Sequence, residues 1–141
     1  MKRPLVVLDS NVVVSALRSR RGAAFRVLAS VGNSAFDIAL SVPLVLEYEE
    51  ALVAQRAPGV TEQDVRTALD YICKVGRGHE VFFLWRPALR DPDDDMVLEL
   101  AVAAGCAAVV TYNVRDFRGA ERFGVEIWTP VELLRKVGLL S

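Results

Sequence analysis

A short apolar run that ends in an acid places the strongest constraint on how this chain can fold. Residues 5–8, Leu-Val-Val-Leu, contain no polar side chain before Asp9. Such a run is typical of a strand that is covered on both faces, as in a parallel sheet. Residues 36–40 and 107–110 have a similar pattern. We therefore expect at least three buried strands.

Helical patterns with recognisable ends lie between these runs. Thr61 begins a capping sequence and Gly76 can end that helix, while Thr129 and Pro130 begin another that Gly138 can close. A third amphipathic stretch covers residues 43–55. The order strand, helix, strand, helices, strand, helix predicts an α/β fold, a three-layer α/β/α sandwich with a mostly parallel central sheet. Ligands of such folds bind beyond the carboxyl ends of the strands.

The overall composition indicates one domain over residues 1–141 and excludes a strongly basic nucleic-acid-binding protein. The chain has 17 Lys and Arg against 18 Asp and Glu, a formal charge of −1. Its first apolar run is too short for a secretory or membrane segment, so we expect a cytoplasmic protein with no membrane contact. We expect Cys73 and Cys106 to be small buried apolar side chains, with no role in a disulfide or a metal site.

Acidic residues recur where the predicted strands end. Asp9 follows the first strand, a run of acids at residues 91–95 precedes a helix, and Asp116 follows the strand that ends near Thr111. A single acid in such a place is most often a helix cap or a turn residue. Recurrence in three loops of the same sheet edge instead predicts a common ligand site.

Helical projection selects the acids that face inward. At 100° per residue, Glu47 falls on the flank of its apolar stripe, whereas Glu49 and Glu50 rotate toward solvent. The same projection on the helix after residue 91 puts Asp94 beside the buried stripe and Asp95 on the opposite side. Pro92 predicts an irregular first turn, which leaves the direction of Asp91 open.

A cluster of these carboxylates needs compensation for its charge. Two carboxylates about 6 Å apart repel by roughly 3 kcal/mol at an effective dielectric of 20. Either some of them carry protons, or a hard divalent cation binds. Oxygen ligands without His or Cys favour Mg²⁺ or Mn²⁺ over zinc. Such a cation supports phosphodiester hydrolysis.

The sequence resembles the PIN-domain ribonucleases, in particular the VapC-like toxins of bacterial toxin–antitoxin pairs. The matching segments are residues 8–12 (LDSNV), 46–50 (LEYEE), 91–95 (DPDDD) and 110–117 (VTYNVRDF). The resemblance implies a PIN-like sandwich, a Mg²⁺- or Mn²⁺-dependent endoribonuclease activity on RNA, a homodimer, and an antitoxin protein that blocks the site.

The resemblance also implies roles for individual residues. Asp9, Glu47, Asp94 and Asp116 match the family's catalytic and metal-binding acids. Asn113 stands where many relatives have another Asp, which implies a weaker or water-mediated last contact. Asn11 and Thr111 match polar residues that orient ligands near the cluster, and Asp91 looks like an additional acid of unsettled role.

Three other classes of protein do not fit the sequence, and one alternative stays open. Asn11 replaces the second Asp that a phosphoaspartate phosphatase needs, the loop after residue 9 lacks the glycines of a dinucleotide site, and Arg18–Arg21 has the wrong charge for a receiver domain. A PIN-like RNA- or protein-binding module without catalysis stays open as the alternative.

Basic and aromatic side chains give weaker indications of where RNA or a partner would bind. The candidates for phosphate contacts are the arginines Arg18, Arg20, Arg21, Arg26, Arg86, Arg90, Arg115 and Arg118, with Arg115 preferred because it adjoins Asp116. We expect His79 to be a surface residue, and Trp85 and Trp128 to be core or dimer-contact residues.

Overall fold

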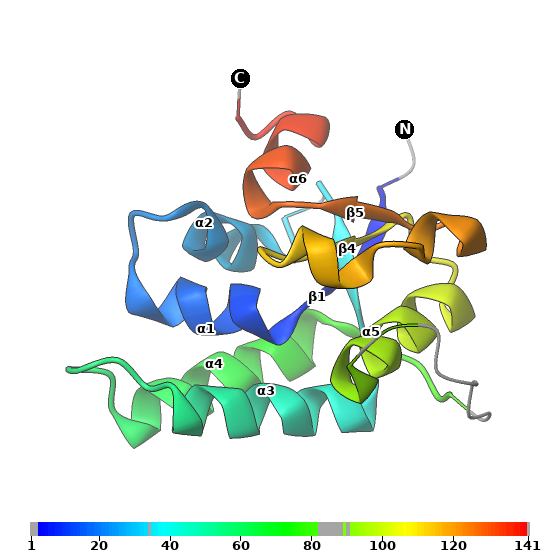
Figure 1. The fold of residues 1–141 in the computed structure, drawn as a ribbon. Coiled ribbons are helices and arrows are strands. Elements are labelled where there is room, and N and C mark those ends of the chain that lie inside the picture. Colours follow the sequence, from blue (N-terminus) through cyan, green and yellow to red (C-terminus); the bar gives the residue numbers. More distant parts are fainter. Residues whose placement is uncertain (1–2, 34, 82–88, 90, 141) are drawn as a thin grey trace.

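The computed structural model describes residues 3–33, 35–81, 89 and 91–140, and it contains a parallel sheet flanked by helices (Figure 1). The strands are β1 (Leu5–Leu8), β2 (Asp37–Leu40), β3 (Arg77–Gly78), β4 (Ala108–Val110) and β5 (Glu126–Trp128). They are arranged in the order β3-β2-β1-β4-β5, and every neighbouring pair is parallel. The predicted α/β sandwich is therefore confirmed.

The centre of the sheet is also the point where the chain changes direction. From β1 the chain moves toward β2 on one side, whereas β4 pairs with the other side of β1 and leads on to β5. Leu8 is in register with Val110, so the carboxyl ends of β1 and β4 lie level. A switch point of this kind leaves a crevice between the two departing loops, the usual ligand position in α/β folds.

The helices begin where their capping residues stand. They are α1 (Ser10–Arg18), α2 (Ala23–Ser30), α3 (Val42–Ala54), α4 (Glu62–Val75), α5 (Pro92–Ala103) and α6 (Pro130–Lys136), with 3₁₀ turns η1 (Val114–Phe117) and η2 (Ala120–Phe123). Thr61 and Thr129 form complete capping boxes with Asp64 and Glu132, as expected. As drawn in Figure 1, α6 lies above the strands and α5 below them.

The core is centred on the apolar runs that predicted the fold. Val6, Val7 and Leu8 of β1 are fully buried, as is β4. Helix α5 contacts β1, β2 and β4, and α2 contacts α6. Trp128 is buried in the core, as predicted, whereas Trp85 lies outside the described residues.

Two strands were not expected from the sequence. Strand β3 has two exposed residues, and β5 begins with the exposed Glu126, so neither shows an apolar run. Gly76 ends α4 with a φ of −78°, and a side chain there would collide with Leu40. The glycine is therefore required by close packing of β3 against β2 and not by a left-handed turn.

Several minor predictions need correction. Cys73 is exposed on α4, whereas Cys106 is buried as expected and burial raises the pKa of its thiol to about 12. His79 is half-buried beside the edge of β3, and its backbone N–H donates to the carbonyl of Leu40 at 2.7 Å, so it is not a surface residue. Within the described ranges, no helix is both long and apolar enough to span a membrane.

Candidate functional site

Asp9 lies at the switch point, between the end of β1 and the start of α1. Its backbone N–H donates to the carbonyl of Val110 at 2.9 Å, which continues the pairing of β1 with β4. Its side chain is the N-cap of α1, where Oδ1 accepts from the backbone N–H of Ser10 at 2.9 Å. The residue is only 7% exposed. Asp9 can cap α1 and still bind a ligand, because only Oδ1 takes part in the cap.

The second carboxylate oxygen of Asp9 is held by two polar side chains. The hydroxyl of Thr111 donates to Asp9 Oδ2 at 2.8 Å, and Asn11 Nδ2 donates to the same oxygen at 3.3 Å. Asn11 Nδ2 also lies 3.1 Å from Thr111 Oγ1, and Asn11 Oδ1 accepts from the backbone N–H of Tyr112 at 3.2 Å. Asn11 and Thr111 thus join the loops after β1 and β4 and fix the orientation of the Asp9 carboxylate.

Glu47 reaches this region from α3. It is half-buried, whereas Glu49 and Glu50 are exposed, so the helical projection is confirmed for all three. The next residue, Tyr48, is fully buried, and its hydroxyl donates to the backbone carbonyl of Leu8. This bond connects α3 with the last residue of β1. Tyr48 is a positioning residue that the sequence indicated only as part of an apolar stripe.

The amino end of α5 supplies two more acids. Asp91 is the N-cap, and its side chain accepts from the backbone N–H of Asp93 at 2.9 Å, while Pro92 takes the regular first helical position. Asp91 is therefore not part of an irregular turn. Asp94 is half-buried, and after burial the charges of Asp9, Asp91 and Asp116 have the largest effects on its pKa.

The prediction for Asp95 is wrong. It is 8% exposed, and its Oδ1 accepts from the backbone N–H of Leu89 at 2.9 Å. The projection assumed that α5 has one solvent-facing side, but Val97, Leu98 and Leu100 are all buried and α5 packs against both the sheet and α3. Asp95 anchors the segment before α5.

The last predicted acid lies on the 3₁₀ turn η1. Asp116 and Arg115 are exposed, and so is Asn113, whose backbone N–H donates to Thr111 Oγ1 at 3.0 Å. The charge of Asp116 raises the pKa of both Asp9 and Asp94. The loop after β4 therefore brings its acid to the same region as the loops after β1 and before α5.

The electrostatics of these groups are those of an uncompensated acidic cluster. Burial, followed by the charges of Asp9, Asp91 and Asp116, raises the pKa of Asp94 to about 7. Burial, and then the charge of Asp93, raises the pKa of Glu47. Burial also raises the pKa of Asp9, against the opposing effect of its hydrogen bonds.

None of the four candidate acids forms an ion pair with Lys or Arg in the described part of the chain; the ion pairs there join Asp37 to Arg3 and Arg77.

The donor chemistry of the cluster suits a hard divalent cation. Every candidate ligand is a carboxylate, amide or hydroxyl oxygen, which Mg²⁺ and Mn²⁺ prefer. Asp9 uses three hydrogen bonds and retains acceptor capacity. Within residues 3–33, 35–81, 89 and 91–140, however, no three His, Cys, Asp or Glu side chains form a group that could hold a metal as they stand. The side chains share one neighbourhood without forming a complete ligand set.

Comparison with known proteins agrees with this architecture. Residues 5–115 match the family model described as a PIN domain. A chain in the crystal structure of VapBC2 from Rickettsia felis, bound to a DNA fragment from their promoter, has a similar fold, with a TM-score of 0.61 at 15% identity. The similarity covers 88% of this chain and 98% of that chain. No curated protein matches the sequence.

Proposed function

Because the chain belongs to the PIN-domain family, we propose that it is a metal-dependent endoribonuclease that hydrolyses RNA phosphodiester bonds. The observation that carries this proposal is the acidic cluster at the switch point, where the pKa of Asp94 is raised to about 7 and none of the four candidate acids pairs with a basic side chain of the described residues. Such a site favours a divalent cation, and RNA brings the phosphate that the cation would bind.

Each residue has a distinct part in this proposal. Asp9, Glu47 and Asp94 would hold the ion, Mg²⁺ or Mn²⁺, with Asp116 as a further ligand directly or through water. Asn11 and Thr111 fix the carboxylate of Asp9. Tyr48 fixes the part of α3 that carries Glu47 against the end of β1. A bound ion of this kind lowers the pKa of a coordinated water and offsets charge on a phosphate oxygen.

Cleavage of a fluorogenic RNA tests the enzymatic proposal. We expect turnover with Mg²⁺ or Mn²⁺, none with EDTA, and none in Asp94→Asn, while Glu62→Gln on the exposed start of α4 retains full activity. RNA binding without cleavage under all metal conditions would instead favour the catalytically inactive RNA-binding module, an alternative that the exposed Asn113 in place of an acid keeps open.

We further propose that the protein is the toxin of a toxin–antitoxin pair. The similar fold of a VapBC2 chain supports this assignment. An antitoxin is usually encoded beside its toxin, so the neighbouring gene supplies the test. We expect expression of this chain to arrest growth, co-expression of the neighbour to relieve the arrest, and Asp94→Asn to cause none. Arrest by Asp94→Asn would contradict a toxicity that depends on RNA cleavage.

A homodimer is the proposed assembly, and the outer face of α3 supports it. Val42, Leu46 and Val53 are 74%, 59% and 63% exposed, and their spacing places them on one side of the helix. Apolar side chains grouped in this way are typical of protein interfaces. Light scattering should give twice the chain mass for the wild type and the chain mass for Leu46→Asp. A monomeric wild type would contradict the dimer.

A further inference from the structure

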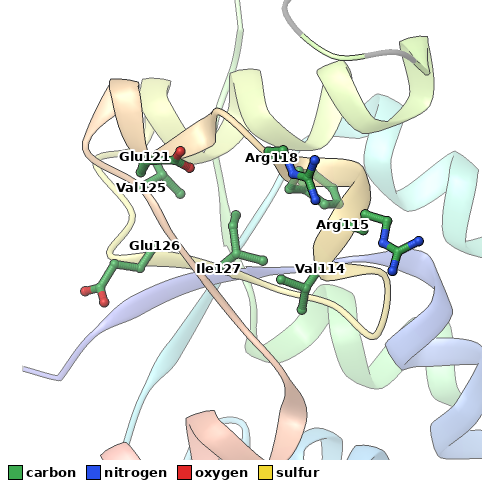
Figure 2. A pocket seen from close by; sticks show the side chains of 8 residues that line it. Val114, Arg115, Arg118, Glu121, Val125, Glu126 and Ile127 are labelled. Atoms are coloured by element: carbon green, nitrogen blue, oxygen red, sulfur yellow. The ribbon is translucent and has the colours of Figure 1, made fainter.

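A hollow beside the acidic cluster has a composition that the catalytic proposal does not explain. It has a volume of about 610 Å³ and lies between η1, η2 and β5. Val125 and Ile127 contribute apolar surface to its wall (Figure 2). Arg115 and Arg118 lie at one end, and Glu121 and Glu126 lie at the other (Figure 2). The charges of this hollow are thus separated along its length.

The geometry of η1 places the two arginines together. Arg115 lies within η1, and Arg118 is the residue that follows its last position; the backbone N–H of Arg118 donates to the carbonyl of Arg115 at 3.3 Å, and both side chains line the hollow. Asp116 is the next residue after Arg115, it does not line the hollow, and its charge raises the pKa of both Asp9 and Asp94. One short turn therefore directs an acid to the cluster and two cations to the hollow.

Both guanidinium groups are available for a ligand. Arg115 and Arg118 are exposed, and neither takes part in an ion pair or a side-chain hydrogen bond with another described residue. Other arginines are engaged: Arg77 binds Asp37, and Arg122 donates to the carbonyl of Gly119 and lies over the ring of Phe123. Two free guanidinium groups beside a hydrolytic site suit phosphate groups, which they bind through paired N–H donors.

We propose that this hollow is a subsite for single-stranded RNA next to the cleavage position, an inference that rests on the proposed ribonuclease function. Arg115 and Arg118 bind the phosphates that flank one nucleotide, and the apolar wall receives its unstacked base. Glu121 and Glu126 repel the next phosphate, so that the bound strand turns away from the hollow there. Recognition of unstacked bases is the usual way in which proteins read RNA.

Fluorescence anisotropy with a short labelled single-stranded RNA tests the subsite. All binding is measured in the Asp94→Asn background, so that the probe stays intact. We expect Arg115→Gln and Arg118→Gln each to weaken binding by about fivefold to tenfold and to reduce the slope of log affinity against log salt by about 0.7. Arg66→Gln, on the exposed surface of α4, is the matched control and should change neither value.

Substitution at the acidic end of the hollow should have the opposite effect on RNA affinity. Glu126 is exposed at the start of β5, and Glu126→Gln should tighten RNA binding because it removes the repulsion of the next phosphate. Glu62→Gln, on the exposed start of α4, is its control and should leave binding unchanged. Equal effects of the two substitutions would show a general charge effect and would overturn the subsite.

The outcomes separate this inference from the ribonuclease proposal. Cleavage by the wild type, together with arginine variants that bind RNA as Arg66→Gln does, overturns the subsite and leaves the nuclease. Absence of cleavage, together with weakened RNA binding in Arg115→Gln and Arg118→Gln, supports the subsite and contradicts the nuclease. Binding of duplex RNA as tight as that of the single strand also overturns the subsite, because a stacked base cannot enter the hollow.

Discussion

The hydroxyl of Tyr48 donates a hydrogen bond to the backbone carbonyl of Leu8, and this contact joins α3 to the end of the central strand. Tyr48 is fully buried, and the neighbouring Asp9 adds to the effect of burial in raising its pKa well above the ordinary value, so the phenol stays a donor. Glu47 precedes it by one residue. The position of one candidate metal ligand thus depends on a bond made by its neighbour.

Tyr48→Phe tests this dependence. The substitution leaves the carbonyl of Leu8 without its donor, and we expect a loss of about 1–3 kcal/mol in the free energy of unfolding, with weaker Mg²⁺ binding measured by calorimetry. Tyr71→Phe is the control, because the Tyr71 hydroxyl donates to the carbonyl of Val31 at 2.7 Å, away from the acids. Tyr71→Phe should lower stability but not Mg²⁺ affinity. Equal Mg²⁺ affinity in both variants would remove the positioning role of Tyr48.

Thr111 should influence metal binding through its hydroxyl group alone. Thr111→Val keeps the shape of a fully buried side chain but removes the donor to Asp9 Oδ2, so the pKa of Asp9 should rise further. We expect metal affinity to fall by about tenfold or more, whereas Thr111→Ser should retain it. Titration of Mn²⁺ followed by electron paramagnetic resonance measures both variants. A Thr111→Ser protein as weak as Thr111→Val would indicate a packing effect instead.

The raised pKa of Asp94 predicts how stability depends on pH without divalent ions. The folded state binds this proton more tightly than the unfolded chain, whose carboxyl has the ordinary pKa of 3.8. The free energy of unfolding should therefore fall as the pH rises from about 4 to about 7. Thermal melting in EDTA across this range should show the fall, and Asp94→Asn should flatten it. A melting temperature that rises toward pH 7 would contradict the cluster.

Removal of one acid should separate activity from stability. Glu47→Gln and Asp94→Asn each relieve repulsion among carboxylates, so both should abolish RNA cleavage and yet melt at a higher temperature than the wild type in EDTA. Glu62→Gln, on the exposed start of α4, should change neither property. Excess Mg²⁺ should stabilise the wild type more than either variant, because a ligand that binds the folded state raises its melting temperature. A lower melting temperature for both variants in EDTA would count against the cluster.

Asp37 offers a stability test away from the site. Its carboxylate lies 3.1 Å from the guanidinium of Arg3 and 2.9 Å from that of Arg77, at the amino end of β2. The pair with Arg77 connects the short edge strand β3 to the sheet. We expect Asp37→Asn to lower the free energy of unfolding by about 1 kcal/mol in chemical denaturation, with unchanged RNA cleavage. A loss of cleavage without a loss of stability would indicate coupling between the two ends of the sheet.

Much of the fold could be predicted from local sequence patterns, because these elements are determined by residues close together in the sequence. The apolar run of β1, the capping boxes at Thr61 and Thr129 and the inward face of Glu47 all follow from residues within a few positions of one another. Strand β3 could not be found in this way, because it has only two residues, too few to show a periodic pattern, and it pairs with a strand almost forty positions earlier.

The contacts that complete the candidate site are distant in sequence. Thr111 binds an acid 102 positions earlier, and Tyr48 binds a carbonyl 40 positions earlier. Nothing in their local sequence shows which partner each hydroxyl finds. Asp95 was misplaced for a related reason, since projection of α5 cannot show that the helix is enclosed on its second side. Strand ends, helical projection and the family resemblance all indicated the acids from the sequence, whereas the hydroxyl groups that orient them became visible only in the fold.

The pairing of β1 with β4 has a consequence for protein synthesis. A nascent chain exposes Asp9 early, but the hydroxyl that orients this acid and the strand that shields it emerge only about a hundred residues later. A truncated product that stops before β4 cannot assemble the crevice. The carboxylates of this chain can therefore meet in one site only late in translation.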